Sequence, residues 1–339
     1  MISRPSLVAG LVILAGVLPL VAVKGFESGA PPAQSEPPAW VSRYDPVLKS
    51  DPALLDGVPG DPSVLKVGAG YVMYYGAAKG DFSDGNTVRI FRATSQDGIA
   101  WKRNSIPVLA PGPAKWDSVK VEAPSVVTLP NGTYRMYYGG SNIRDSEAGF
   151  HIGLATSRDG VKWQKYDSPV LSATKASFDD LGILGSSVLQ KNGHYWMWYP
   201  GLSSKSAVAI GLARSQDGLR WEKKGVVLKL DVEKVNKSDI GVISPHVIWN
   251  GAMFEMFYVI LENEGKLMGP IWHAVSSDGL QWKKDARPIL ERGGKKSWTA
   301  NGIDGPSVLL ENGKYRMWFS GNRTDGKTFF EGGIGLAEK

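Results

Sequence analysis

A sequence unit of about sixty residues recurs along most of this chain, and it constrains the fold more than any other feature. Trp40, Trp101, Trp163, Trp221 and Trp282 follow one another at spacings of 61, 62, 58 and 61 residues. Each tryptophan leads into a near-copy of one phrase, which reads PVL, VVL or PIL. A repeat of this length indicates that one structural unit is built several times and packs against its own copies.

Each full unit reads as four strands separated by turn residues. The first strand carries Pro-Ser-Val or a variant of it, the second is aromatic as in YRMYYGG, the third is rich in small residues as in IGLATS, and the fourth contains the tryptophan. Period-two alternation and the turns PNG, KNG, ENG and RDG are typical of antiparallel strands. Since four antiparallel strands make a propeller blade, we predict an all-β, five-bladed β-propeller.

The order of the strands predicts how the ring closes. The first tryptophan phrase precedes any complete unit, while the last unit stops at GGIGLAEK without such a phrase. We therefore expect the strand over residues 40–48, which begins at Trp40, to be the outer strand of blade five. Such closure removes an exposed sheet edge. It also makes residues 40–339 a single propeller domain.

The first 39 residues differ from the rest in composition. Residues 6–23 are apolar and uncharged, and the stretch up to residue 39 is rich in proline. This pattern resembles a signal peptide over residues 1–23, or an uncleaved membrane anchor of the same length, followed by a linker over residues 24–39. Both alternatives predict a secreted or periplasmic protein, or one tethered to the membrane through residues 6–23.

Composition excludes several classes of function. The chain has no cysteine, which rules out disulfides and thiolate metal sites. Its net charge of +6 is spread along the sequence without a basic run, so we expect no nucleic acid partner. We expect a monomer that requires no cofactor.

The most conspicuous motif has a structural interpretation. The phrases SQDGIAW, SRDGVKW, SQDGLRW and SSDGLQW look similar to the Asp-box of sialidases and related propellers. An Asp-Gly pair suits a tight hairpin, in which the aspartate bonds local backbone amides. Because strand direction alternates, these hairpins must lie on the face opposite the start of each inner strand.

Carboxylates stand at the start of three inner strands, where the blades converge on the axis. The five starts read PGDPSV, KVEAPSV, ILGSSV, VISPHV and GIDGPSV, which places Asp61, Glu122 and Asp304 at one mouth of the channel. Acids gathered near an axis are costly, because like charges and desolvation both disfavour ionisation. This cost suggests a functional use. The alternative, that each acid caps a turn or pairs with a base, remains open.

At these motifs the chain, over residues 40–339, resembles the five-bladed glycoside hydrolases of the furanosidase type, above all family 43 and its relatives in families 32, 62, 117 and 130. The resemblance implies that Asp61 in GDPSV is the general base or nucleophile and that Glu122 in EAPSV is the general acid. Asp304 has the offset of the acid, but on blade five. Family 43 carries its acid on blade three, where this chain has Gly185 and Ser186.

The predicted substrate contacts lie on the same face of the propeller. They are aromatic residues for stacking on sugar rings, polar residues for binding hydroxyls and one channel histidine: Tyr75, Tyr138, Trp198 and Trp318; Asn142, Arg144, Asn322 and Arg323; and His246. Packing between blades is the alternative role for the aromatic residues. No metal-binding spacing is present, and a calcium ion in the channel is the one ion that the resemblance suggests.

The resemblance implies a glycoside hydrolase that cleaves arabinosides, xylosides or fructosides of plant or microbial polysaccharides and oligosaccharides, and the N-terminal pattern adds the prediction that it is exported. Its two carboxylates need unlike environments, because one must hold a proton while the other is ionised. Two other functions remain open. One is a propeller that binds carbohydrate without catalysis, and the other is a glycoside phosphorylase of the same fold.

Overall fold

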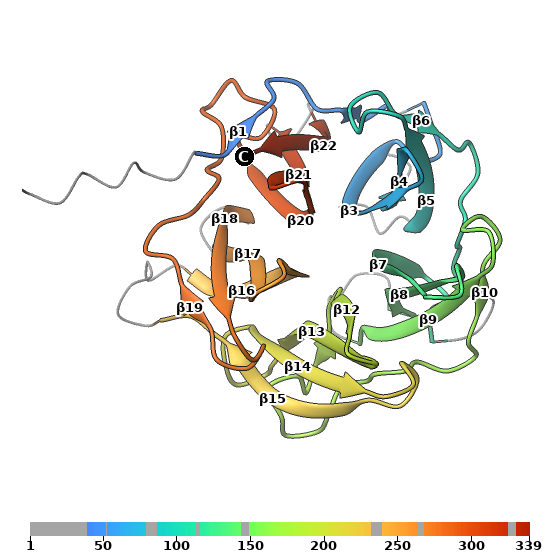
Figure 1. The fold of residues 1–339 in the computed structure, drawn as a ribbon, viewed down its shortest axis with the longest axis vertical. Helices are drawn as coiled ribbons and strands as arrows, with labels where there is room; N and C mark the ends of the chain where they lie inside the picture. The colour runs from blue at the N-terminus through green and yellow to red at the C-terminus, as the bar shows by residue number, and fades with distance from the viewer. Residues whose placement is uncertain are drawn as a thin grey trace, which may run out of the picture. The chain divides into compact units, whose positions relative to one another are not determined.

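The sheets of the protein are arranged as five blades around a central axis (Figure 1). The structure is a computed structural model that describes residues 39–51, 53–78, 87–112, 116–143, 149–231, 239–262, 268–324 and 330–339. Those residues form strands and turns, and none of their segments is a helix that could span a membrane. The all-β, five-bladed prediction is confirmed. The predicted signal peptide or anchor lies outside the described residues.

The first three blades follow one another along the chain. Blade one contains β3 (Val58–Val67), β4 (Gly70–Ala78), β5 (Arg89–Ser95) and β6 (Lys102–Arg103). Blade two contains β7 (Lys120–Thr128), β8 (Tyr134–Ser141), β9 (His151–Ser157) and β10 (Gln164–Lys165). Blade three contains β11 (Gly182–Ile183), β12 (Ser187–Lys191), β13 (His194–Leu202), β14 (Ala209–Ser215) and β15 (Glu222–Leu228). Its inner strand is thus split into β11 and β12.

The last two blades complete the ring. Blade four contains β16 (Asp239–Trp249), β17 (Phe254–Glu262), β18 (Met268–Ser276) and β19 (Lys283–Lys284). Blade five contains β20 (Gly302–Glu311), β21 (Lys314–Thr324) and β22 (Phe330–Glu338), with β1 (Val41–Ser42) and β2 (Leu48–Lys49) on its outer side. Both β1 and β2 pair antiparallel with β22, which confirms that the strand beginning at Trp40 closes the ring.

The repeated Pro-Ser-Val phrase joins each blade to the next. At four junctions the serine hydroxyl of one inner strand accepts a hydrogen bond from a backbone N–H in the next blade. The donor is the valine that follows the serine or histidine of that blade's own phrase. These bonds are Val126 to Ser63 (3.1 Å), Val188 to Ser125 (2.9 Å), Val247 to Ser187 (2.8 Å) and Val64 to Ser307 (2.9 Å). In blade four His246 takes the place of serine, and its Nε2 lies 3.1 Å from the carbonyl oxygen of Val308 in blade five. The inner strands therefore form a continuous ring of polar links.

A second set of links uses the Asp-box hairpins. An aromatic side chain of one blade donates a hydrogen bond to the glycine carbonyl in the hairpin of the next blade: Tyr74 to Gly160 (2.7 Å), Tyr137 to Gly218 (2.9 Å), Trp198 to Gly279 (3.0 Å) and Trp318 to Gly98 (2.9 Å). The repeat tryptophan of the next blade packs edge-on against the same aromatic ring, as in the pair Tyr74 and Trp163 at 88°. Trp40 packs on Phe257 in the same way, at 82°. The apolar core accordingly consists of clusters at the seams between blades.

The Asp-box aspartates have the predicted local role. In blade one the Oδ1 atom of Asp97 accepts hydrogen bonds of 2.8 Å from the backbone amides of Ile99 and Ala100. Bonds from the amides of Ala100 and Ile99 lower the pKa of Asp97 to about 2. Asp159 makes the same two bonds in blade two. These carboxylates hold hairpins and are not candidates for catalysis.

The serine ring predicts a measurable contribution to stability. Ser307→Ala leaves the buried N–H of Val64 without its acceptor at the junction of the last blade with the first. We expect a loss of about 1–3 kcal/mol in the free energy of unfolding, measured by urea denaturation. Ser105→Ala, at an exposed serine, is the matched control and should change it by less than about 0.5 kcal/mol. Equal stability of the two variants would contradict the role of the ring.

Candidate active site

The three predicted carboxylates lie on the inner strands of three neighbouring blades. Asp304 is in β20 of blade five, Asp61 in β3 of blade one and Glu122 in β7 of blade two. Hydrogen bonds from Val64 to Ser307 and from Val126 to Ser63 show that these strands adjoin. One sector of the channel therefore carries all three acids.

A bulge lies beside each of these carboxylates. The register of the inner strand shifts between Gly60 and Ser63, between Glu122 and Ser125, and between Asp304 and Ser307. The residue before proline has a positive φ in each case: 49° at Asp61, 46° at Ala123 and 55° at Gly305. Ser244 of blade four repeats the geometry with a φ of 51°. A β-bulge turns a side chain away from the regular pleat, and a positive φ at a residue other than glycine is strained. The sequence Xaa-Pro thus places a bulge with positive φ in the inner strands of blades one, two, four and five.

Asp61 is held against blade five. Its backbone N–H donates a 2.8 Å hydrogen bond to Ser320 Oγ on β21. Its Oδ1 lies only 3.0 Å from the point where a Cβ atom on Gly305 would stand. Gly305 follows Asp304 directly, and Ser320 is the register partner of Asp304. Asp61 and the Asp304 segment are therefore in immediate contact, and the absent side chain at Gly305 makes room for the Asp61 carboxylate.

Asp304 is the carboxyl group whose environment favours the protonated form. Burial raises the pKa of Asp304, while hydrogen bonds from the Ser244 hydroxyl and the Gly305 N–H act in the opposite direction. Its Oδ1 atom is buried and has no hydrogen-bond partner within the described part of the chain. A carboxyl group with a raised pKa and an unpaired oxygen is suited to donating a proton.

Glu122 lies between blades one and two. Its Cβ is 3.5 Å from the Cβ position that Gly76 would have, and its Cγ is 3.7 Å from that of Gly139. Both glycines belong to the second strands of their blades, β4 and β8. The half-buried Glu122 side chain thus occupies space that glycine leaves on each side.

His246 is engaged in the ring of inner strands. Since a carbonyl oxygen can only accept, the 3.1 Å contact with Val308 requires the tautomer that carries its hydrogen on Nε2. Burial lowers the pKa of His246 to about 4. The imidazole is therefore neutral at ordinary pH and joins blade four to blade five.

The sugar-stacking role predicted for four aromatic residues is wrong. Tyr75, Tyr138, Trp198 and Trp318 are fully buried and present no ring face to a sugar. The middle of the second strand of each of these blades is covered on both faces by the neighbouring blades, so these four side chains lie in the core. The tyrosine hydroxyls are also used: Tyr75 donates to Asp56 at 2.6 Å and Tyr138 to Asp117 at 2.9 Å.

These buried aspartates form a feature that the sequence analysis missed. Asp117 contacts Lys165 at 2.6 Å as well as Tyr138, and Asp179 in blade three contacts Lys223 as well as Tyr199. A faint signal was present in WDS and FDD, which precede the inner strands of blades two and three. Each group ties the outer strand of a blade to its second strand, which is a structural role.

The remaining predicted contacts are dispersed. Asn142 is exposed just after β8, and Asn322 is half-buried within β21. Arg323 donates to the Lys296 carbonyl and to Glu331, both at 2.9 Å. Arg144 lies outside the described residues. No cluster of three metal-ligating His, Asp or Glu side chains is found among the residues with described positions.

A family model agrees with this geometry. The model of the glycosyl hydrolases family 32 N-terminal domain matches residues 121–303, more than half of the chain. The chain belongs to this family. It is a carbohydrate-active enzyme of the glycosidase and glycoside phosphorylase class. The match also favours family 32, one of the families named in the sequence analysis, over family 43. The acid that family 43 carries on blade three is missing from this chain.

Individual proteins widen the comparison. The 1,2-beta-oligomannan phosphorylase of a Thermoanaerobacter species is 29% identical over 222 residues, which cover 63% of this chain and 67% of that protein. The structure of BT0996 in a complex with RGII has a TM-score of 0.71 at 18% identity, covering 88% of this chain and 91% of the other. A family 130 glycoside hydrolase that targets beta-1,2 mannosidic linkages in Candida mannan has a TM-score of 0.66 at 17% identity, covering 87% and 91%. The two structural matches show the shared fold of this family 32 chain.

The burial of Tyr75 gives a test of its role in the family 32 chain. In Tyr75→Phe the buried Asp56 carboxylate keeps Arg103 at 3.3 Å but loses the phenol donor. We expect unfolding free energy to fall by about 1–3 kcal/mol, with unchanged sugar affinity per folded molecule, measured by denaturation and calorimetry. Tyr44→Phe, at a residue 88% exposed, is the control. Because phenylalanine keeps the aromatic ring, a selective loss of sugar affinity would show instead that the Tyr75 hydroxyl contacts the ligand.

Proposed function

We propose that this protein hydrolyses glycosidic bonds with the carboxylates Asp61, Asp304 and Glu122 at the channel mouth. The observation that supports it most is the contact of Asp61 with the segment of Asp304, the acid whose pKa burial raises. Acid and base catalysis of glycoside cleavage needs two carboxyl groups of unlike pKa near one another, and Asp304, with its raised pKa, stands on the strand that Asp61 contacts. The substrates proposed are arabinosides, xylosides and fructosides, and the relatives add β-mannosides. Action outside the cytoplasm stays a prediction.

The roles follow from the surroundings of each group. Asp304 would give its proton to the leaving oxygen, because its buried position favours the neutral acid. Asp61 would activate water or attack the anomeric carbon. Glu122, on the other side of Asp61, would hold substrate hydroxyls or assist the acid. This assignment moves the proton donor from Glu122, as the family resemblance implied, to Asp304.

Replacement of the proton donor has a distinctive signature. Asp304→Asn should lower kcat for natural glycosides about 10²–10⁴-fold, since their leaving groups need a proton. Aryl glycosides with acidic leaving groups should be affected far less, because they depart with little protonation. The measurement is kcat and KM over a series of leaving groups. A strong leaving-group dependence in Glu122→Gln, and none in Asp304→Asn, would return the donor role to Glu122.

The pH profile supplies an independent check. Activity requires protonated Asp304, so kcat/KM of the intact protein should fall as the pH rises through the raised pKa of Asp304. Asp304→Asn should remove this alkaline limb of the pH profile for aryl glycosides.

Asp61→Asn should abolish turnover of every glycoside. If sugars bind to the intact protein and none is cleaved, the propeller is a binding module.

A second candidate function is phosphorolysis, because a relative 29% identical is named as a 1,2-beta-oligomannan phosphorylase. In that reaction inorganic phosphate replaces water as the nucleophile. We expect β-1,2-mannobiose and longer oligomannosides to be the informative substrates. Phosphorus NMR distinguishes the two reactions: formation of a sugar 1-phosphate that depends on added phosphate supports phosphorolysis, and release of free sugar without phosphate supports hydrolysis.

A further inference from the structure

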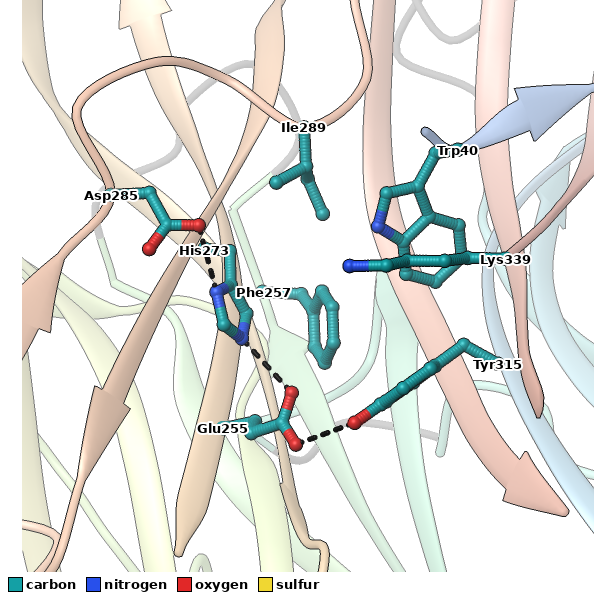
Figure 2. Close-up of a pocket in the computed structure, with 8 residues that line it drawn as sticks. All are labelled: Trp40, Glu255, Phe257, His273, Asp285, Ile289, Tyr315 and Lys339. Atoms are coloured by element: carbon teal, nitrogen blue, oxygen red, sulfur yellow. Dashed lines mark hydrogen bonds and ion pairs between the residues drawn. The ribbon is translucent and has the colours of Figure 1, made fainter. Parts of the chain in front are cut away.

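A small pocket lies at the seam between blades four and five, away from the three carboxylates. It is a cavity of about 140 Å³ whose walls include Trp40, Phe257 and Ile289 together with a polar group formed by Glu255, His273 and Asp285 (Figure 2). The residues come from β17, β18, the segment after β19 and the start of the closing strand.

The pocket exists because this seam lacks the link found at the other four. Phe257 occupies the place of Tyr74, Tyr137, Trp198 and Trp318, but its ring cannot donate a hydrogen bond. Among the described residues blade five has no Asp-box hairpin to receive one, since its outer strands β1 and β2 come from the other part of the chain. Space that a hairpin fills elsewhere is therefore left open here.

Beside this pocket two carboxylates contact the same imidazole ring. Nδ1 of His273 lies 3.0 Å from Asp285 Oδ2, and its Nε2 lies 3.0 Å from Glu255 Oε2. The other oxygen of Glu255 accepts a 2.7 Å hydrogen bond from Tyr315 of blade five. A neutral imidazole has a single N–H, so only the protonated ring can donate to both carboxylates.

The charges around His273 favour its protonated form. The groups that face it or line the same pocket are Glu255 on β17, Asp285 after β19, Tyr315 on β21 and Lys339 after β22. Burial by itself lowers the pKa of His273, but the hydrogen bonds and charges of Glu255 and Asp285 outweigh burial and raise it. Neighbouring Lys284 is bonded to Asp231 and points its charge elsewhere.

We propose that His273 is a pH-operated clasp that fastens the segment after β19 to the body of blade four. In the protonated state it bridges Glu255 and Asp285. When the ring loses a proton to solvent, the one remaining N–H stays with Glu255, because its side chain is only 8% exposed and would lose more by losing this donor. Asp285, whose side chain is 42% exposed, turns to water instead.

Release of Asp285 loosens one wall of the pocket. The released segment runs on to Ile289, which also lines the cavity. Its backbone is held by the bonds from Asp285 N–H to the His273 carbonyl (3.0 Å) and from Ile289 N–H to the Ile271 carbonyl (2.9 Å). The clasp therefore contributes stability below the usual histidine pKa, and this contribution is lost as the pH rises through the raised pKa of His273.

Blade two provides a matched control within the same molecule. There Tyr166 N–H bonds the Leu154 carbonyl and Val170 N–H bonds the Ile152 carbonyl, both at 2.8 Å. Leu154 occupies the position of His273, so the same backbone arrangement occurs without an imidazole. Hydrogen exchange of residues 285–290 can thus be compared with residues 166–171 in one experiment.

We expect the protection of residues 285–290, relative to residues 166–171, to fall about tenfold between about pH 5.5 and about pH 8.5. Asp285→Asn should abolish this change and lower the midpoint at which His273 titrates by nitrogen NMR. The NMR spectrum should show both ring nitrogens protonated at low pH and only Nε2 at high pH. A constant protection ratio, a midpoint unchanged in Asp285→Asn, or retention of the hydrogen on Nδ1 at high pH would each overturn the proposal.

Discussion

The hydrogen bond from a valine N–H to the serine of the preceding blade is the interaction on which the rest of the structure depends. The inner strands of neighbouring blades adjoin near the axis but are not paired with one another in the sheets. A short hydroxyl bridges two blades four times, and His246 does so once. Each of the four serine links supplies an acceptor to a valine N–H, which would otherwise lie unpaired between two blades.

The same phrase that joins the blades also prepares the site. Proline precedes the bridging serine in blades one, two and five, and the residue before proline lies in a bulge with positive φ. In blade one this residue is Asp61, while Glu122 and Asp304 stand one position earlier. The serine that joins two blades and the bulge that orients the carboxylate are therefore only a few residues apart in each of these strands. Because the serine links fix the bulges relative to one another, the spacing of the carboxylates is held by the ring and not by surface loops.

The seam between blades four and five departs from the pattern twice. A histidine replaces the bridging serine near the axis, and a phenylalanine replaces the hydrogen-bonding aromatic residue at the Asp-box end. Trp40, at the start of the closing strand, lines this seam together with the cluster of Glu255, His273 and Asp285. At this seam the hydrogen bond from Tyr315 of blade five to Glu255 of blade four is made to a carboxylate, where the aromatic residues of the other seams donate to a glycine carbonyl.

The sequence by itself determined the architecture. The tryptophan spacing set the number of blades, the turn residues set four strands in each, and the offset of the first phrase set the closure at Trp40, because repeats and period-two patterns are local properties of the chain. It also placed the carboxylates Asp61, Glu122 and Asp304 at the same mouth of the channel.

Only the tertiary structure decided what surrounds each side chain. The sequence left both sugar stacking and packing between blades open for Tyr75 and Trp318, and their complete burial decides for packing. Ser320 carried no signal, since it reaches Asp61 across 259 residues. The raised pKa of Asp304 arises from burial between blades, which no spacing along the chain can express.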